Sequence, residues 1–248
     1  MNEFIQACIV ANEEIATALE KGIDTVLFEK TKIGVGGDVS SRLDIFAESI
    51  FVKHLALFGQ IESEESGLIG EGEAQIIIDP IDGSSNALSL FPYFGTSVAR
   101  VNADGILDAA VVCNLANRDI FYKTPGKDLL HGKLFKNDFT SPQNAPASEI
   151  GLFEKAYANP KLVAMMDASG LKFRSPGAIA LSLAYAHTVR FVLFVGTFRI
   201  YDFAAGLALC EGLEVIVEQD YVIVSKDKNV VSMLEILIGK QKTIKEEK

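Results

Sequence analysis

The stretch IIIDPIDGSSN, Ile76 to Asn86, places two aspartates directly after three consecutive isoleucines. The apolar run predicts a buried strand that starts near Ala74. Asp79 stands where this strand leaves the sheet, and we expect Pro80 to end the strand because proline has no N–H for the next ladder hydrogen bond. Ligands of open sheets gather at such strand ends. The stretch therefore predicts a buried strand that opens into a charged site.

The residues after this strand predict a turn that can receive an anion. Asp82 and Gly83 form the turn, and residues 84–86 offer hydroxyl, amide and backbone N–H groups at a helix start. A helix start attracts anions, phosphate above all. The aspartate pair alone leaves a second interpretation open, in which Asp79 and Asp82 only cap backbone groups of an ordinary turn.

Composition excludes several classes of protein. The 248 residues are 49% hydrophobic and 23% charged, as is usual for a globular protein of one domain or two closely joined halves. The net charge of −10 argues against a nucleic-acid or membrane surface, since both require a positive field. Three separated cysteines with apolar neighbours predict neither disulfides nor a zinc site. Acidic residues break any N-terminal signal sequence, so we expect a cytoplasmic protein.

Periodicity predicts mixed helices and strands in two halves, residues 1–140 and 141–248, joined in one compact unit. Helical spacing predicts amphipathic helices over 3–21 and 42–59, separated by a mobile glycine-rich loop at 34–41. Strands follow in a meander to about residue 124. The second half alternates a helix near 150–157, further helices and strands, and a last helix after residue 228. This alternation favours a layered α/β or α+β fold.

Further carboxylates stand near the predicted element ends. The run ESEES contains Glu64 and Glu65, which would repel each other near a site unless cations neutralised them. Asp202 lies between a short apolar strand and a helix, and Asp44 lies on the helix over 42–59. Taken singly, the acidic run is typical of a solvated loop and Asp202 of a helix cap. Together, without histidine or cysteine pairs, they favour Mg²⁺ over zinc.

These motifs together resemble the inositol monophosphatase and fructose-1,6-bisphosphatase superfamily of magnesium-dependent, lithium-sensitive phosphatases. The shared features are DPIDGSSN at 79–86, the upstream pair Glu64 and Glu65, and Asp-x-Ala-Ala-Gly from Asp202. They follow the family's order and span the chain from about Asp44 to Gly206. The resemblance implies an α+β fold, a layered αβαβα sandwich of the sugar-phosphatase type, and a homodimer.

The resemblance also implies roles for individual residues. Asp44 acts with the Ser84 hydroxyl on the attacking water, and Glu64 joins them in catalysis. The implied Mg²⁺ ligands are Glu64, Asp79, Asp82, Asp202 and the main-chain carbonyl of Ile81. The implied substrate-binding residues are Gly83, Ser84, Ser85, Asn86, Gly177 and Ala178. Independently, attack on an anionic phosphate monoester needs its charge neutralised, which closely spaced metal ions achieve.

Two departures from the family pattern concern the substrate. The position seven residues before Asp202, acidic in animal-type inositol monophosphatases, is Val195, and Tyr201 stands where those enzymes have tryptophan. Arg174 lies near Gly177, although this segment equally fits a plain helix start.

From the motifs as a whole we predict a Mg²⁺-dependent phosphomonoesterase for a small sugar or inositol phosphate. A fructose-1,6-bisphosphatase, a 3'(2'),5'-bisphosphate nucleotidase or a non-catalytic metal- or phosphate-binding regulator are the alternatives.

Overall fold

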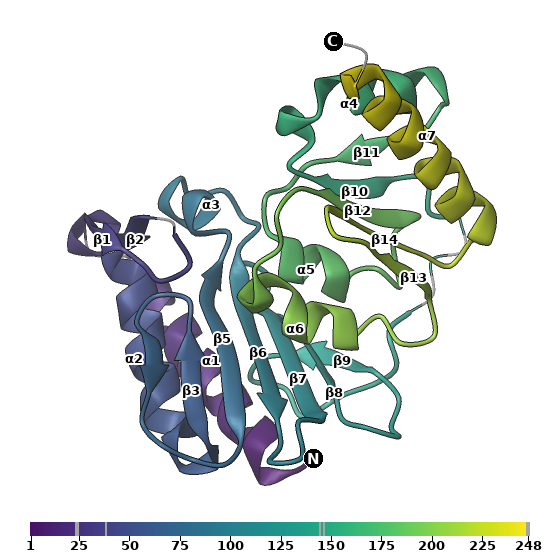
Figure 1. Cartoon of the computed structure of the whole chain (residues 1–248). Helices are drawn as coiled ribbons and strands as arrows, with labels where there is room; N and C mark the ends of the chain where they lie inside the picture. The colour runs from purple at the N-terminus through teal and green to yellow at the C-terminus, as the bar shows by residue number, and fades with distance from the viewer. Residues whose placement is uncertain (23–24, 38, 144, 146, 247–248) are drawn as a thin grey trace.

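The two larger β-sheets alternate with layers of helices through the molecule (Figure 1). The structure is a computed structural model and describes residues 1–22, 25–37, 39–143, 145 and 147–246. The layers run in the order α1 and α2, a seven-stranded sheet, α5 and α6, a five-stranded sheet, and α4 with α7. This αβαβα sandwich confirms the predicted fold class.

The first sheet has the strand order β4-β3-β5-β6-β7-β8-β9. Only β3 and β5 pair in parallel, and the other neighbours are antiparallel. Its strands are β3 (Gln60–Ser63), β4 (Gly67–Ile69), β5 (Gln75–Asp82), β6 (Gly95–Val101), β7 (Leu107–Asn114), β8 (Asp119–Lys123) and β9 (Leu130–Lys133). A separate two-stranded sheet, β1 (Lys30–Ile33) with β2 (Val39–Ser41), precedes α2.

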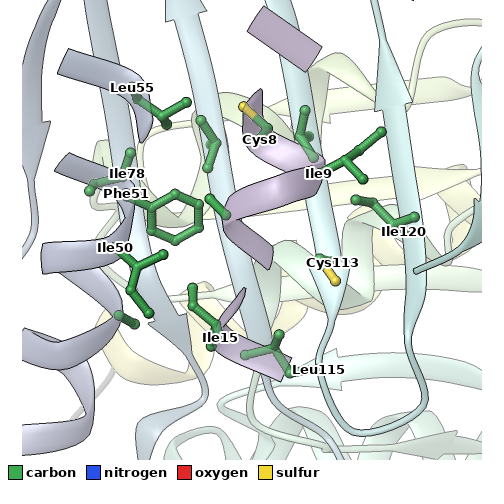
Figure 2. Close-up of a cluster of buried hydrophobic side chains, with 14 of the residues drawn as sticks. Cys8, Ile9, Ile15, Ile50, Phe51, Leu55, Ile78, Cys113, Leu115 and Ile120 are labelled. Atoms are coloured by element: carbon green, nitrogen blue, oxygen red, sulfur yellow. The ribbon is translucent and has the colours of Figure 1, made fainter. Parts of the chain in front are cut away.

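Helices α1 (Glu3–Glu20) and α2 (Arg42–Leu55) cover the outer face of this sheet. Asn2 caps α1, and Ser41 begins α2 with a capping box that Asp44 completes. Figure 2 shows Phe51 of α2 and Ile15 of α1 turned toward the sheet, where they form a core cluster with Ile78. The apolar stripes predicted for both helices are therefore the faces that they bury.

The second sheet has the strand order β11-β10-β12-β14-β13. Strand β10 pairs in parallel with both neighbours, and the remaining pairs are antiparallel. The strands are β10 (Gly151–Glu154), β11 (Phe173–Arg174), β12 (Phe191–Val195), β13 (Glu214–Val217) and β14 (Tyr221–Ser225). Helices α4 (Pro160–Ala168) and α7 (Lys228–Glu246) pack on its outer face.

The middle layer joins the two sheets. Helix α5 (Ile179–Ala184) turns Leu181 toward the first sheet and Leu183 toward the second, and α6 (Ile200–Ala208) does the same with Ala205 and Phe203. Both helices are therefore apolar on two sides, as expected for buried helices. Their N-terminal ends lie beside the short helix α3 (Ser84–Leu88), where the candidate site forms (Figure 1).

Two local expectations are wrong. Residues 151–154 of the predicted helix near 150–157 form β10, because four buried residues in succession pair with strands on both sides. Strand β5 also continues through Pro80 to Asp82, with a register irregularity between Asp79 and Asp82. The missing N–H thus falls at a bulge, where proline is tolerated. Among the described residues, none of the helices has the length and apolarity needed to cross a membrane.

Candidate metal and phosphate site

The bulge in β5 brings Asp79 and Asp82 to the same face of the sheet. Ile76 and Ile78 pack toward the outer helices and Ile77 toward the middle layer, in the usual alternation of a strand. Without a slip, residues three apart would face opposite sides. The irregularity after Asp79 returns Ile81 to the outer core and leaves both aspartates on the middle-layer side.

Glu64 reaches the same edge because β3 runs parallel to β5. The Glu64 amide donates to the Ile78 carbonyl at 3.2 Å, so this glutamate leaves its strand level with Asp79. Asp202 comes from the first turn of α6. Carboxylate oxygens of Glu64, Asp79 and Asp202 lie within 4.8 Å of one another, and all three residues are buried. With Asp82, four carboxylates from the end of β3, from β5 and from α6 therefore converge on one acidic cluster.

Burial and mutual repulsion make this cluster unfavourable without a cation. The pKa of Asp79 is raised well above its ordinary value by burial, and further by Glu64 and Asp82. Burial also raises the pKa of Asp82, to which Asp202 adds. Buried carboxylates that raise one another's pKa are stabilised by a bound cation. Since every donor is a hard carboxylate or carbonyl oxygen, the residues fit a divalent cation such as Mg²⁺.

Asp44 and Ser84 meet beside the cluster. The Ser84 hydroxyl donates to Asp44 Oδ1 at 2.6 Å, and its oxygen also lies 2.9 Å from the Ile81 carbonyl oxygen. The other Asp44 oxygen accepts from the Ser41 amide at 2.6 Å and from the Ser41 hydroxyl at 2.7 Å. Asp44 is therefore held by its own helix cap, with one oxygen left to orient Ser84.

Gly83 packs closely against the segment that leads into α5. It has φ +87°, the left-handed conformation that glycine adopts without strain. A Cβ here would lie 3.1 Å from the Ala178 Cβ and 3.2 Å from the Gly177 carbonyl oxygen. The structure thus places Gly83 directly against the Gly177–Ala178 segment.

Asn86 links α3 to the backbone of two other segments. Its amide nitrogen donates to the carbonyl oxygens of Tyr93 and Pro176, each at 2.7 Å. Both amide hydrogens are thereby committed to the backbone, so Asn86 ties α3 to the second half of the chain. The neighbouring Ser85 is exposed at the surface of α3.

Two buried glutamates hold the loops of the site. Glu48 accepts from the Ser66 amide at 3.1 Å and the Ser66 hydroxyl at 2.6 Å, and also from the Ser63 hydroxyl, which fixes the turn that carries Glu64. Glu154 accepts from the amides of Gly177 at 2.9 Å and Ala178 at 3.4 Å. Of these two glutamates, only Glu48 could be foreseen from the sequence, because it follows Asp44 by four residues and so shares a helix face with it. No sequence pattern pointed to Glu154.

The acidic run and the glycine loop also pack into the site. Glu65 accepts from the Ser40 hydroxyl, and burial raises its pKa to about 7. The Gly36 amide donates to the Glu64 carbonyl at 2.8 Å. The solvated-loop interpretation of this run is therefore wrong for Glu64 and Glu65, which are both buried. Residue 38 of the loop lies outside the described residues.

Comparisons with known proteins relate the chain to a family and to named relatives. The model of the inositol monophosphatase family matches residues 2–218. A bifunctional NADP phosphatase/NAD kinase of Methanococcus maripaludis is 29% identical over 79% of this chain and 40% of its own length. A fructose-1,6-bisphosphatase of Pyrococcus furiosus is 32% identical over 62% of this chain and 58% of its own. This chain thus spans less than two thirds of the length of each of these relatives.

Solved structures share the whole fold. An inositol monophosphatase of Thermotoga maritima superimposes with a TM-score of 0.77 at 21% identity, over 96% of this chain and 98% of the other. The extragenic suppressor protein SuhB of Bartonella henselae gives the same TM-score at 22% identity, over 96% and 97% of the two chains. At these identities the superpositions show the fold, and the match over residues 2–218 shows the family. The chain belongs to the inositol monophosphatase family.

Proposed function

We propose that this protein is a Mg²⁺-dependent phosphomonoesterase that hydrolyses a small sugar or inositol phosphate. One observation carries the proposal. The hydrogen-bonded pair of Asp44 and Ser84 lies beside the buried carboxylates of Glu64, Asp79 and Asp202. Membership of a phosphatase family supports the same reaction. The proposed pair and the proposed metal ligands come from segments far apart in the chain.

Five residues would hold the metal. They are Glu64, Asp79, Asp82, Asp202 and, through its carbonyl oxygen, Ile81. When bound, Mg²⁺ neutralises phosphate charge and lowers the pKa of water. The Asp82 carboxylate is held in place by a hydrogen bond, which its Oδ2 accepts from the Leu181 amide at 2.9 Å. That contact also couples the site to α5, on the substrate side.

The protein residues would supply the path for the proton. Because the Ser84 hydroxyl donates its hydrogen to Asp44 Oδ1, the lone pairs of Ser84 Oγ are left to accept a hydrogen from the attacking water. As that water loses its proton to Ser84 Oγ, the Ser84 hydrogen passes to Asp44. Asp44 then acts as the general base through one hydroxyl group. Glu64 would contribute through its place in the metal cluster.

The backbone at the start of α3 would bind the phosphate. Amide groups of Gly83, Ser84 and Ser85 lie at the turn where the chain enters this helix, and such amides stabilise the charge that develops on phosphate oxygens. Gly177 and Ala178 would contact the rest of the substrate, since they pack directly against Gly83.

The relatives widen the set of substrates worth testing. The relatives named in the comparisons include bifunctional NADP phosphatase/NAD kinases, a fructose-1,6-bisphosphatase, and a fructose-1,6-bisphosphatase/inositol-1-monophosphatase. Val195, where animal-type enzymes have an acid, favours a substrate other than inositol phosphate. A bisphosphate or NADP is thus the second candidate. Other relatives are named Nus factor SuhB, and we keep a non-catalytic regulator as the alternative.

A phosphate-release assay tests the proposal. The purified protein is incubated with inositol-1-phosphate, fructose-1,6-bisphosphate, glycerol phosphate, 3'-phosphoadenosine-5'-phosphate and NADP, with Mg²⁺ or with excess EDTA. We expect release from a subset only with Mg²⁺, and inhibition by lithium. Full activity in EDTA would contradict the proposal. Release from none of these substrates, with Mg²⁺ bound, would favour the regulator.

The substitution Asp82→Asn assigns the activity to this site. Asparagine keeps an oxygen that can accept from the Leu181 amide, so we expect the fold to survive while phosphate release is lost. Asp128→Asn, the same change at an exposed position, is the matched control and should leave release unchanged. We further propose that the protein is cytoplasmic and forms a homodimer. Size exclusion with light scattering would test the dimer by measuring its molar mass.

A further inference from the structure

Arg199 lies between two of the carboxylates proposed as metal ligands. It is the N-cap residue of α6, three positions before Asp202. Its Nε donates to Asp202 Oδ2 at 2.9 Å and its Nη2 donates to Asp202 Oδ1 at 3.1 Å. Its Nη1 donates to Glu64 Oε1 at 2.5 Å. One guanidinium group therefore bridges a carboxylate of the first sheet and one of the middle layer.

This bridge supplies positive charge where the cluster needs it. The side chains of Glu64 and Asp202 are only 9% and 6% exposed, and Asp79 adds a third buried carboxylate within 4.8 Å. Arginine remains protonated at any physiological pH, and its planar fork matches both oxygens of a carboxylate. Arg199 thus places a permanent positive charge at the cluster.

The same contacts put Arg199 in conflict with a bound metal. The guanidinium uses both Asp202 oxygens and one Glu64 oxygen, which are the donors that a divalent cation would use. A dication among oxygens this close together would also repel the guanidinium strongly. The Arg199 side chain is 28% exposed, so it has an open side toward which it can move.

We propose that Arg199 is the counter-ion of the metal-free site and competes with the divalent cation for Glu64 and Asp202. The inference rests on the proposed function, because it takes these carboxylates as metal ligands. Arg199 stabilises the protein without metal and lowers its affinity for metal. Metal binding is then an exchange of one cation for another, with Arg199 displaced from the cluster.

Calorimetric titration with MgCl₂, without substrate, tests this competition. We expect Arg199→Met to bind Mg²⁺ about tenfold more tightly than the wild type, the change that 1.4 kcal/mol makes to an equilibrium constant. In EDTA the variant should unfold at a lower temperature than the wild type. Saturating Mg²⁺ should raise its midpoint by more, since tighter binding gives a larger linked stabilisation. A purely structural role of Arg199 would weaken Mg²⁺ binding instead.

Two further variants sharpen the result. Arg174→Met removes the same charge from an exposed arginine whose Nη1 donates to the neighbouring Phe173 carbonyl, and it should leave Mg²⁺ affinity unchanged. Equal tightening in this control would overturn the inference, because the effect would then be one of net charge. Arg199→Lys keeps the charge without the two-pronged geometry and should bind Mg²⁺ with intermediate affinity.

The outcomes separate this inference from the proposed function. If neither the wild type nor Arg199→Met binds Mg²⁺, the metal site itself is contradicted. If both bind with equal affinity, or the variant binds more weakly, only the competition is overturned. Should Arg199→Met fail to fold, the arginine Nε–Hε resonances of the wild type decide, with Arg199 assigned from Arg199→Lys. A shift of the Arg199 signal on Mg²⁺ addition supports displacement, and an unchanged signal while Mg²⁺ binds refutes it.

Discussion

The Ser84 hydroxyl donates a 2.6 Å hydrogen bond to Asp44 Oδ1, although forty residues separate them in the chain. Asp44 is held in turn by Ser41, whose amide and hydroxyl both donate to its second oxygen. The hydrogen bonds that cap the start of α2 therefore also orient Asp44 and Ser84, the pair proposed to activate the attacking water. The Asp44 carboxylate thus caps its own helix with one oxygen and binds Ser84 of the candidate site with the other.

Removing the Ser84 hydroxyl should lower catalysis without loss of stability. Ser84→Ala breaks the path from water to Asp44, so we expect kcat to fall by about 10²- to 10⁴-fold, the usual contribution of general base catalysis. Steady-state phosphate release measures the effect. Ser49→Ala removes an exposed hydroxyl that bonds only within its own helix and should change neither kcat nor the unfolding midpoint. A fully active Ser84→Ala would contradict the proposed proton path.

A side chain at Gly83 should disrupt the contact between the two halves. Gly83→Ala combines left-handed strain with crowding against Ala178 and the Gly177 carbonyl, so we expect unfolding free energy to drop by about 2–4 kcal/mol. Gly105 has φ +78° and open space around it, so Gly105→Ala should cost only about 1 kcal/mol of strain. Urea unfolding of both variants isolates the crowding. If both variants lost the same unfolding free energy, crowding at Gly83 would contribute nothing to the loss.

Glu154 should act on substrate binding as a positioning residue. Its carboxylate accepts from the amides of Gly177 and Ala178 and from the Ser182 hydroxyl, the last at 2.5 Å. Glu154→Gln replaces one acceptor by a donor, which would displace the Gly177–Ala178 segment. We expect KM to rise several-fold with a smaller change in kcat.

The matched control is Glu149→Gln, at an exposed glutamate paired with Lys172, which should leave KM unchanged. A Glu154→Gln enzyme with lower kcat at constant KM would instead place this residue in the chemical step.

Asp119 should make stability depend on pH at a place remote from the metal cluster. Burial opposes its charge, but hydrogen bonds from His131, Lys133 and Tyr185 outweigh burial and hold its pKa well below the ordinary 3.8. A carboxylate with a lowered folded pKa contributes stability above the unfolded pKa and loses it as pH falls toward the folded value. The stability difference between wild type and Asp119→Asn should therefore be larger at pH 6 than at pH 3.5.

Denaturant unfolding at the two pH values measures this difference. Asp128→Asn, at an exposed site, should show the same stability difference from wild type at both. A wild-type advantage over Asp119→Asn that grows toward low pH would contradict the lowered pKa.

Much of the fold could be predicted from neighbouring residues alone. The helical spacing of 3–21, observed as Glu3–Glu20, and the apolar run of β5 are local patterns, and a local pattern is set by which face each side chain must bury. The layered architecture follows from the order of such elements and from the family resemblance. The prediction failed at residues 150–157, where pairing on both sides makes Gly151–Glu154 a strand that periodicity does not reveal.

The candidate site, like the fold, was predictable from the sequence in part and depends on tertiary contacts for the rest. The sequence by itself determined the set of carboxylates, Glu64, Asp79, Asp82 and Asp202, because their chemistry and order carry the family motif. Only the tertiary structure decided how these groups are oriented and held. The slip at Pro80 turns two aspartates to one face, Glu154 fixes Gly177, and Arg199 meets Glu64 across 135 residues of chain. Such contacts depend on how helices α5 and α6 pack between two sheets, which no local pattern encodes.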